Sequence, residues 1–308
     1  MVQRMAALSL ENLTKRYGDK DVVQSISLEI KEGEVFGLLG PNGAGKSSTI
    51  NMVSGVTRPS SGKIAVFGHD NQKEFITTRR LTGVMHQEIV VDNFFTIGTA
   101  LKIHAGYYGV ADDPAWRARL VDRLALGPHL AKQMNKLSGG MKRRFMVAKA
   151  LIHKPRLLIL DEPTAGVDVE LRQTLWEFVR ELNREFGTTV VLTTHYLEEA
   201  EEMCGRVAIM NFGKIIALDE TRHLLEKMDE RRLLIHLSDR ISALPAGLDP
   251  ATVALADDGA TLSFRINQAN SPAAVLAAIS AQRLPVKDIE TKSPSLQEAF
   301  LKLTQGAR

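Results

Sequence analysis

The feature that most constrains the fold is a glycine-rich loop that follows a short apolar segment. Residues 40–47 read Gly-Pro-Asn-Gly-Ala-Gly-Lys-Ser and fit the pattern G-x-x-x-x-G-K-[ST] in full, directly after the apolar run Val35–Leu39. Glycines let backbone N–H groups turn toward phosphates without a Cβ in the way. A helix that starts near Lys46 points its positive end at the same anion. The pattern therefore predicts a strand–loop–helix unit that binds nucleotide phosphates.

Within this phosphate loop, residues 40–47, two side chains have distinct expected roles. Lys46 is expected to reach the β- and γ-phosphates, and Ser47 to offer its hydroxyl to Mg²⁺. The residues predicted to contact the nucleotide in this region are Gly40, Pro41, Asn42, Gly43, Ala44, Gly45, Lys46, Ser47 and Ser48.

Two carboxylates follow a second apolar segment, Leu157–Leu160. Ligands of open α/β sheets bind at strand ends, and successive strand residues point to opposite sides. We therefore assign Asp161 to Mg²⁺, through water, and Glu162 to polarising the attacking water. An acidic pair alone is equally typical of a solvated strand end or a helix start. Its occurrence together with the phosphate loop favours the catalytic interpretation.

The wider pattern predicts an α/β fold with a mostly parallel sheet, because strand-like and helix-like segments alternate over the first ~220 residues. Residues 88–155 are largely helical and predict an insertion. After about residue 225 the segments shorten and Pro and Gly punctuate the turns, which predicts a small second α+β domain at 226–308, after a first domain at 1–225. Further strands are predicted at Val22–Ile30, Val84–Met85, Thr189–Leu192, Val207–Met210, Leu233–Leu237 and Thr261–Ile266.

Composition limits the classes of partner. The formal net charge of the chain is +3, which is too small to suggest a nucleic-acid surface. Cys204 is the single cysteine, so no internal disulfide can form and a reducing compartment is expected. No run of ~18 apolar residues predicts a membrane span, and residues 1–10 do not read as a signal peptide. Any path across a bilayer must therefore come from another polypeptide.

Residues 8–218 resemble the ABC ATPase family, because further motifs occur in the family's order. The signature segment, residues 137–141, reads Leu-Ser-Gly-Gly-Met and is similar to a family loop that usually ends in Gln. The departure at Met141 keeps the groups expected to touch phosphate, which are Ser138, Gly139 and Gly140. The resemblance implies a P-loop NTPase core with a parallel sheet, an antiparallel β subdomain and a helical insertion, with ATP and Mg²⁺ as cofactors.

Four more residues match family positions around the nucleotide. Tyr17 matches the aromatic residue that stacks on adenine, and Gln87 matches the glutamine that senses the γ-phosphate and magnesium. Asp168 matches a loop that communicates across the family's dimer, and His195 matches a histidine that contacts the γ-phosphate. Each has an ordinary structural explanation when taken singly, such as a helix N-cap at Asp168. As a set they imply Glu162 and His195 as catalytic residues, and Ser47, Gln87 and Asp161 as metal-binding residues.

The resemblance also implies partners. In the family the signature contacts the nucleotide of the partner subunit, so one phosphate loop and one signature per chain imply a head-to-tail dimer. Residues 195–201 and 294–300 resemble the bacterial ABC-2 branch, which exports drugs and polysaccharides. This implies a peripheral protein at the cytoplasmic face of the bacterial inner membrane, working with an integral membrane permease and without nucleic acid.

Two other classes of protein fit the sequence less well than an exporter subunit. A soluble ATPase that remodels ribosomes or DNA usually has two ATPase domains or a long coiled coil. This chain has one phosphate loop, and only about 50 residues separate Gln87 from Leu137. A regulatory module without turnover is disfavoured by the presence of Glu162 and His195.

The segment 88–95 is unusually apolar for a connector. Phe94 and Phe95 either pack beneath the helical insertion or help to line a groove for a short cytoplasmic helix of the permease. The sequence leaves both alternatives open.

Overall fold

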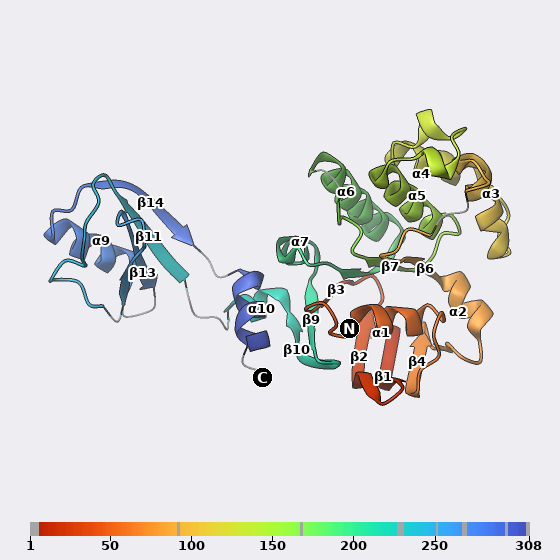
Figure 1. Cartoon of the computed structure of the whole chain (residues 1–308), viewed down its shortest axis with the longest axis horizontal. Coiled ribbons are helices and arrows are strands. Elements are labelled where there is room, and N and C mark those ends of the chain that lie inside the picture. Colours follow the sequence, from red (N-terminus) through yellow and green to blue (C-terminus); the bar gives the residue numbers. More distant parts are fainter. Residues whose placement is uncertain are drawn as a thin grey trace. The chain divides into compact units, whose positions relative to one another are not determined.

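The computed structural model describes residues 6–90, 93–166, 169–226, 231–250, 252–266, 270–292 and 295–305. The chain divides into two compact units, Met1–Thr221 with Leu303–Arg308, and Arg222–Lys302. Both units can be followed in Figure 1. Among the described helices, none combines the length and the apolarity that crossing a membrane requires.

The central sheet of the first unit has the strand order β10-β9-β3-β8-β7-β6. Neighbours among β9, β3, β8, β7 and β6 are parallel, and β10 is antiparallel to β9. β7 and β8 are buried along their whole length, which explains their continuous apolar sequences. The predicted α/β fold with a mostly parallel sheet is confirmed. The strands are β3 (Val35–Leu39), β6 (Thr82–Met85), β7 (Leu157–Asp161), β8 (Thr189–Thr193), β9 (Arg206–Asn211) and β10 (Lys214–Glu220).

A second, antiparallel sheet has the order β2-β1-β4-β5. Its strands are β1 (Ala6–Tyr17), β2 (Lys20–Lys31), β4 (Ser61–Val66) and β5 (His69–Asp70). Buried and exposed residues alternate along the second half of β2, as the sequence predicted for Val22–Ile30. The buried face joins one hydrophobic core with Phe36 of β3 and Met52 of α1 (Lys46–Val53).

The chain between β6 and β7 is helical, as predicted. Its helices are α3 (Ile97–Tyr107), α4 (Pro114–Arg123) and α5 (Gly139–Leu151), with the short 3₁₀ turns η1 (Gly127–His129) and η2 (Met134–Lys136). Figure 1 shows them grouped beyond β6 and β7. Each α-helix begins at a residue whose side-chain oxygen accepts a backbone N–H of the first turn, namely Thr96, Asp113 and Ser138. Such caps explain why helices begin at these positions.

The other helices of the first unit are α2 (Phe75–Leu81), α6 (Val169–Phe186) and α7 (Leu197–Met203). The helix α8 (Thr221–Glu226) begins at Thr221, where the first stretch of that unit ends. The second unit holds an antiparallel sheet of order β12-β13-β11-β14. Its core includes Ile235 and Phe264 of the sheet and Ile279 of a helix. Its elements are β11 (Arg231–Leu237), β12 (Val253–Leu255), β13 (Thr261–Ile266), α9 (Pro272–Ala281) and β14 (Val286–Lys292), and α10 (Leu296–Gln305) follows.

Candidate active site

The predicted catalytic residues lie where four parallel strands end. β3 runs into Gly40, Gln87 lies two residues after β6, β7 ends at Asp161 with Glu162 next, and β8 leads to His195. These strands are neighbours in the sheet and run in the same direction. Their carboxyl ends therefore meet at one edge, where open α/β sheets bind ligands.

The phosphate loop keeps its path only with glycine at two positions. Gly45, the residue before α1, has φ of 104°, and a Cβ there would lie 2.7 Å from the carbonyl oxygen of Val22. At Gly40 a Cβ would lie 2.5 Å from the carbonyl oxygen of Met210. Any side chain would push the loop away from the strands that support it. The loop instead leads directly into α1, whose first N–H groups lack intrahelical acceptors and suit a phosphate.

Lys46 lies across this loop with a relative exposure of 7%. Its Nζ donates to the carbonyl oxygens of Gly40 at 2.7 Å and Pro41 at 3.1 Å. Burial lowers the pKa of the Lys46 ammonium, and the nearby carboxylates of Glu162 and Asp161 oppose that shift. A buried cation with carbonyl partners is poised to exchange them for phosphate oxygens.

Glu162 is held through its side chain and both of its peptide groups. Its carboxylate Oε2 accepts a hydrogen bond from Gln87 Nε2 at 3.0 Å and lies 3.5 Å from His195 Nδ1. Its N–H lies 3.0 Å from the carbonyl oxygen and 3.1 Å from the Oγ1 of Thr193. Its carbonyl oxygen accepts from Arg143 Nη1 at 2.8 Å. The structure thus brings together three residues that the sequence placed in one site.

Asp161 is buried, and its carboxylate accepts a hydrogen bond from the hydroxyl of Thr193. Asp161, Ser47 and Gln87 line the same cavity, which has a volume of about 670 Å³. A carboxylate, a hydroxyl and an amide are oxygen donors of the kind that Mg²⁺ takes together with water and substrate phosphates. The residues predicted to bind Mg²⁺ therefore fit that ion.

Other predicted residues are not joined to this site. Tyr17 is 47% exposed at the end of β1, with the Lys15 ammonium 4.7 Å from its ring centre. Ser138 caps α5 and is exposed, as is Gly139 beside it. Within the described residues, no hydrogen bond or ion pair links Tyr17 or Ser138 to the phosphate loop. Asp168 lies outside the described residues.

A buried carboxylate with no role predicted from the sequence connects two loops of the site. Glu199 of α7 is 5% exposed, and its Oε2 accepts from the hydroxyls of Thr164 and Thr194, each at 2.9 Å. Thr164 follows Glu162 by two residues, and Thr194 precedes His195. Arg172 lies 3.3 Å from the other Glu199 oxygen. An acidic residue in a short helix gives no sequence signal of burial, so only the tertiary structure identifies this link.

Comparisons with known proteins agree on one family. A sequence profile described as ABC transporter matches residues 23–165. The linearmycin resistance ATP-binding protein LnrL of Bacillus subtilis (strain 168) is 35% identical, over 96% of this chain and 98% of that protein. The daunorubicin/doxorubicin resistance ATP-binding protein DrrA of Streptomyces peucetius is 37% identical, over 98% of this chain and 93% of that protein. A solved structure described as an ATP binding subunit of an ABC transporter is 28% identical, with a TM-score of 0.67. The match covers 72% of this chain and 93% of that one.

Proposed function

Because this chain belongs to the ATP-binding proteins of ABC transporters, we propose that it hydrolyses ATP at the strand edge described above to drive export through a separate membrane permease. The observation that carries the proposal is the environment of Glu162. A buried carboxylate beside Gln87, His195 and Lys46 has the surroundings of a general base next to a γ-phosphate.

Each residue of the edge has a role in this proposal. Lys46 and the N–H groups of α1 bind the β- and γ-phosphates, together with the backbone of residues 40–48. Glu162 polarises the attacking water. His195 and Gln87 both contact Oε2 of Glu162 and so orient its carboxylate. Ser47, Gln87 and Asp161 would hold Mg²⁺, which would supply positive charge against the phosphate oxygens. Tyr17 stacks on the adenine from the exposed end of β1.

A dimer completes the site. Ser138, Gly139 and Gly140 lie at the capped start of α5, and Ser138 and Gly139 are exposed. A capped helix start binds anions, but no described contact brings this one to the phosphate loop of its own subunit. We therefore infer that it contacts the ATP of a second copy, in a head-to-tail dimer with two-fold symmetry. Asp168 belongs to the communication between the two copies.

Export is supported by the relatives, because one of them is named Nod factor export ATP-binding protein I and two others are named as resistance ATP-binding proteins. The proposed docking site for the permease is part of the apolar segment 88–95, which lies between β6 and α3. Val90 is 66% and Phe94 is 88% exposed, although both are apolar. An apolar face on a short cytoplasmic helix of the permease would cover them. The proposed location is the cytoplasmic face of the bacterial inner membrane.

The substitution Glu162→Gln tests the proposal. Gln keeps the size and the hydrogen bonding but removes the base, so ATP turnover should fall by ~10²–10⁴. ATP should remain bound, and sedimentation with ATP and Mg²⁺ should show a dimer. Glu11→Gln, on the exposed surface of β1, is the matched control and should behave as wild type. Wild-type turnover in Glu162→Gln would sink the assignment.

A further inference from the structure

We propose that Arg143 is a positioning residue for Glu162, and that it links the signature helix α5 to the hydrolytic site of its own subunit. The inference rests on the proposed function, because it concerns the same reaction. Arg143 matched no motif in the sequence, and its role comes from one contact across the fold.

The contact joins α5 to the residue after β7. Arg143 lies four residues after the first residue of α5, and its Nη1 donates to the carbonyl oxygen of Glu162 at 2.8 Å in a partly buried environment. No carboxylate among the described residues lies within ion-pair distance of Arg143. The guanidinium is therefore directed at a backbone oxygen, and hydrogen bonds from a charged donor are stronger than those from a neutral one.

The backbone at Glu162 needs such support. Its φ is 50°, a left-handed conformation that costs free energy for any residue with a Cβ. The N–H of Glu162 donates to the carbonyl and hydroxyl oxygens of Thr193. The carbonyl oxygen of Glu162 accepts from Arg143 and, at 3.3 Å, from the N–H of Ala165. The next residue is Pro163, which has no N–H to anchor the turn. Without Arg143, the peptide group after Glu162 loses its strongest partner.

A shift of that peptide group displaces the Glu162 Cα to which it is bonded, and the side chain moves with the Cα. The Glu162 carboxylate meets Gln87 at 3.0 Å and His195 at 3.5 Å through the same oxygen. A shift of about 1 Å at a general base is enough to slow the chemical step strongly. Nucleotide affinity depends instead on Lys46 and the phosphate loop, which Arg143 does not contact. Loss of Arg143 should therefore lower kcat and leave KM for ATP nearly unchanged.

The same contact couples the two sites of the dimer. Ser138 at the start of α5 contacts the ATP of the partner in the proposed dimer, and Arg143 lies little more than one helical turn further along. A nucleotide on the partner thus fixes α5, and α5 fixes the Glu162 that acts on the subunit's own ATP. The contact thus gives the nucleotide on one subunit a route by which to stabilise the position of the base on the other.

Substitutions in the full-length protein test the positioning role. Arg143→Met removes the donor, and kcat should fall about ten-fold while KM for ATP changes less than about two-fold. The Hill coefficient for ATP should fall toward one. Arg143→Lys keeps a charged donor and should restore most of the activity. Lys142→Met removes the same charge from the same turn of α5, without a side-chain contact to Glu162, and should match wild type. All variants should melt like the wild type.

Mixed dimers, made from two differently tagged copies purified in succession, locate the effect. Glu162→Gln in one copy leaves one live site, whose base is Glu162 of the other copy. Arg143→Met should slow single-turnover hydrolysis when it is placed in that other copy, and should have no effect in the Glu162→Gln copy. If Arg143 acted only on the nucleotide that its own signature touches, these two results would be exchanged.

The outcomes separate the two proposals. An exchanged pattern, or an unchanged kcat in Arg143→Met, overturns the role of Arg143 while the proposed function stands. Full turnover in homodimeric Glu162→Gln overturns the proposed catalytic base itself, whatever Arg143 does.

Discussion

At the scale of single residues, the site depends on opposite charges that are buried together. Lys46 is 7% and Asp161 is 3% exposed, and both lie at the carboxyl edge of the sheet. Isolated charges of this kind are costly in a protein interior. Carbonyl oxygens for Lys46 and the Thr193 hydroxyl for Asp161 offset part of that cost. The arrangement makes sense for a site whose ligand brings phosphates and a cation of its own.

We expect Lys46→Ala to weaken ATP binding by roughly 10–100-fold, because it removes a charged donor that no neighbour replaces. Titration with a fluorescent ATP analogue measures the affinity, and a thermal melt confirms folding. Lys63→Ala, on the exposed surface of β4, is the control. Wild-type affinity in a folded Lys46→Ala protein would contradict the placement of the site.

At the scale of elements, the exposure of Phe94 and Phe95 in the connector from β6 to α3 bears on whether these residues pack beneath the insertion or dock the permease. Phe94 is 88% exposed, so it does not pack beneath the insertion. Phe95 is half-buried and lines a small cavity with Ile103 and Phe145. The two neighbouring residues therefore have different expected roles, with docking at Phe94 and packing at Phe95.

Alanine substitutions distinguish these roles. Phe94→Ala should melt normally and keep basal ATPase activity, but copurify less with the permease. Phe95→Ala should lose part of the ~3–5 kcal/mol that a fully buried Phe contributes. Melting curves and pull-downs on the same two variants provide the comparison. Full-strength permease binding by Phe94→Ala would place the docking site elsewhere.

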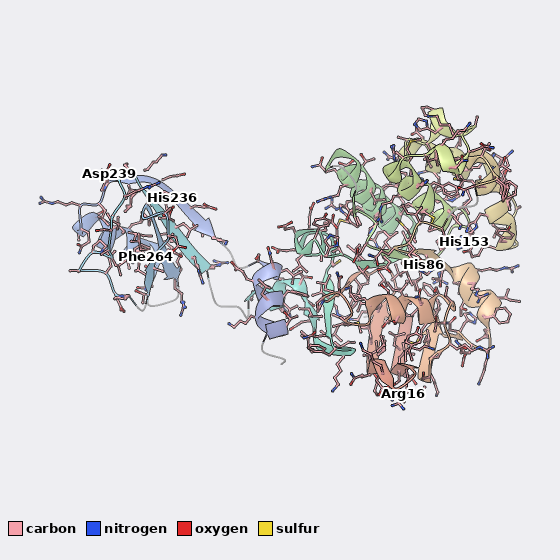
Figure 2. The ribbon with its side chains drawn as sticks, viewed as in Figure 1. Arg16, His86, His153, His236, Asp239 and Phe264 are labelled. Atoms are coloured by element: carbon pink, nitrogen blue, oxygen red, sulfur yellow. The ribbon has the colours of Figure 1, made fainter. Side chains whose placement is uncertain are left out.

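Buried histidines in and beside the helical insertion are expected to make the stability of the protein depend on pH. His153, just after α5, stacks on Tyr108 with ring centres 3.6 Å apart, and its Nε2 lies 3.1 Å from the Thr82 carbonyl oxygen. Burial lowers the pKa of His153 to about 4 and that of His104 to about 3, with Lys149 adding to the shift at His104. Figure 2 labels His153 and also His86, whose pKa is likewise lowered by burial.

Because these pKa values are lowered, the unfolded chain binds protons that the folded chain does not. Stability from His153 and His104 should therefore be complete above pH 6.5 and be lost as the pH falls toward 4 and 3. Thermal melts between pH 7.5 and about 4.5 measure the slope. His153→Gln keeps a polar side chain without the titration and should flatten this slope. A slope unchanged by His153→Gln would exclude this cause.

At the scale of the whole molecule, two compact units have separate hydrophobic cores. The core of the second unit is built from its own strands and α9, and includes Ile235, Phe264 and Val275. The predicted nucleotide-binding and catalytic residues all precede residue 222. The interpretation of 226–308 as an accessory domain, dispensable for ATP binding, is a prediction.

Ending the chain after residue 226 tests this domain assignment, because such a cut falls after the last motif and removes, from the first unit, only residues 303–308. The shortened protein should bind ATP with the affinity of the full chain, while assembly with the permease or its coupling to ATP hydrolysis changes. Nucleotide titration, a melt and permease pull-down report the three properties. A folded, soluble product that no longer binds ATP would show that the tail belongs to the catalytic core.

The sequence by itself determined the parts of this protein whose function lies in consecutive residues. The phosphate loop, β3 and the acidic pair after β7 are readable because a fixed spacing of Gly, Lys and carboxylate residues is itself the chemical requirement. The order of the other motifs then indicated the family and its α/β core. The resemblance implied an antiparallel β subdomain, but the residue ranges of its strands β1, β4 and β5 were not predicted, because their stability depends on pairing with residues far away in the chain.

Only the tertiary structure decided how these parts act on one another. The link from Glu199 to Thr164 and Thr194 spans 35 and 5 residues, and the bond from Arg143 to the Glu162 carbonyl oxygen spans 19. Neither contact produces a local sequence pattern, because the sequence around a charged helix residue is the same whether its partner is water or a polar group of the protein. The physical reason is burial: folding removes the water from these groups, and each must then find its partner across the fold.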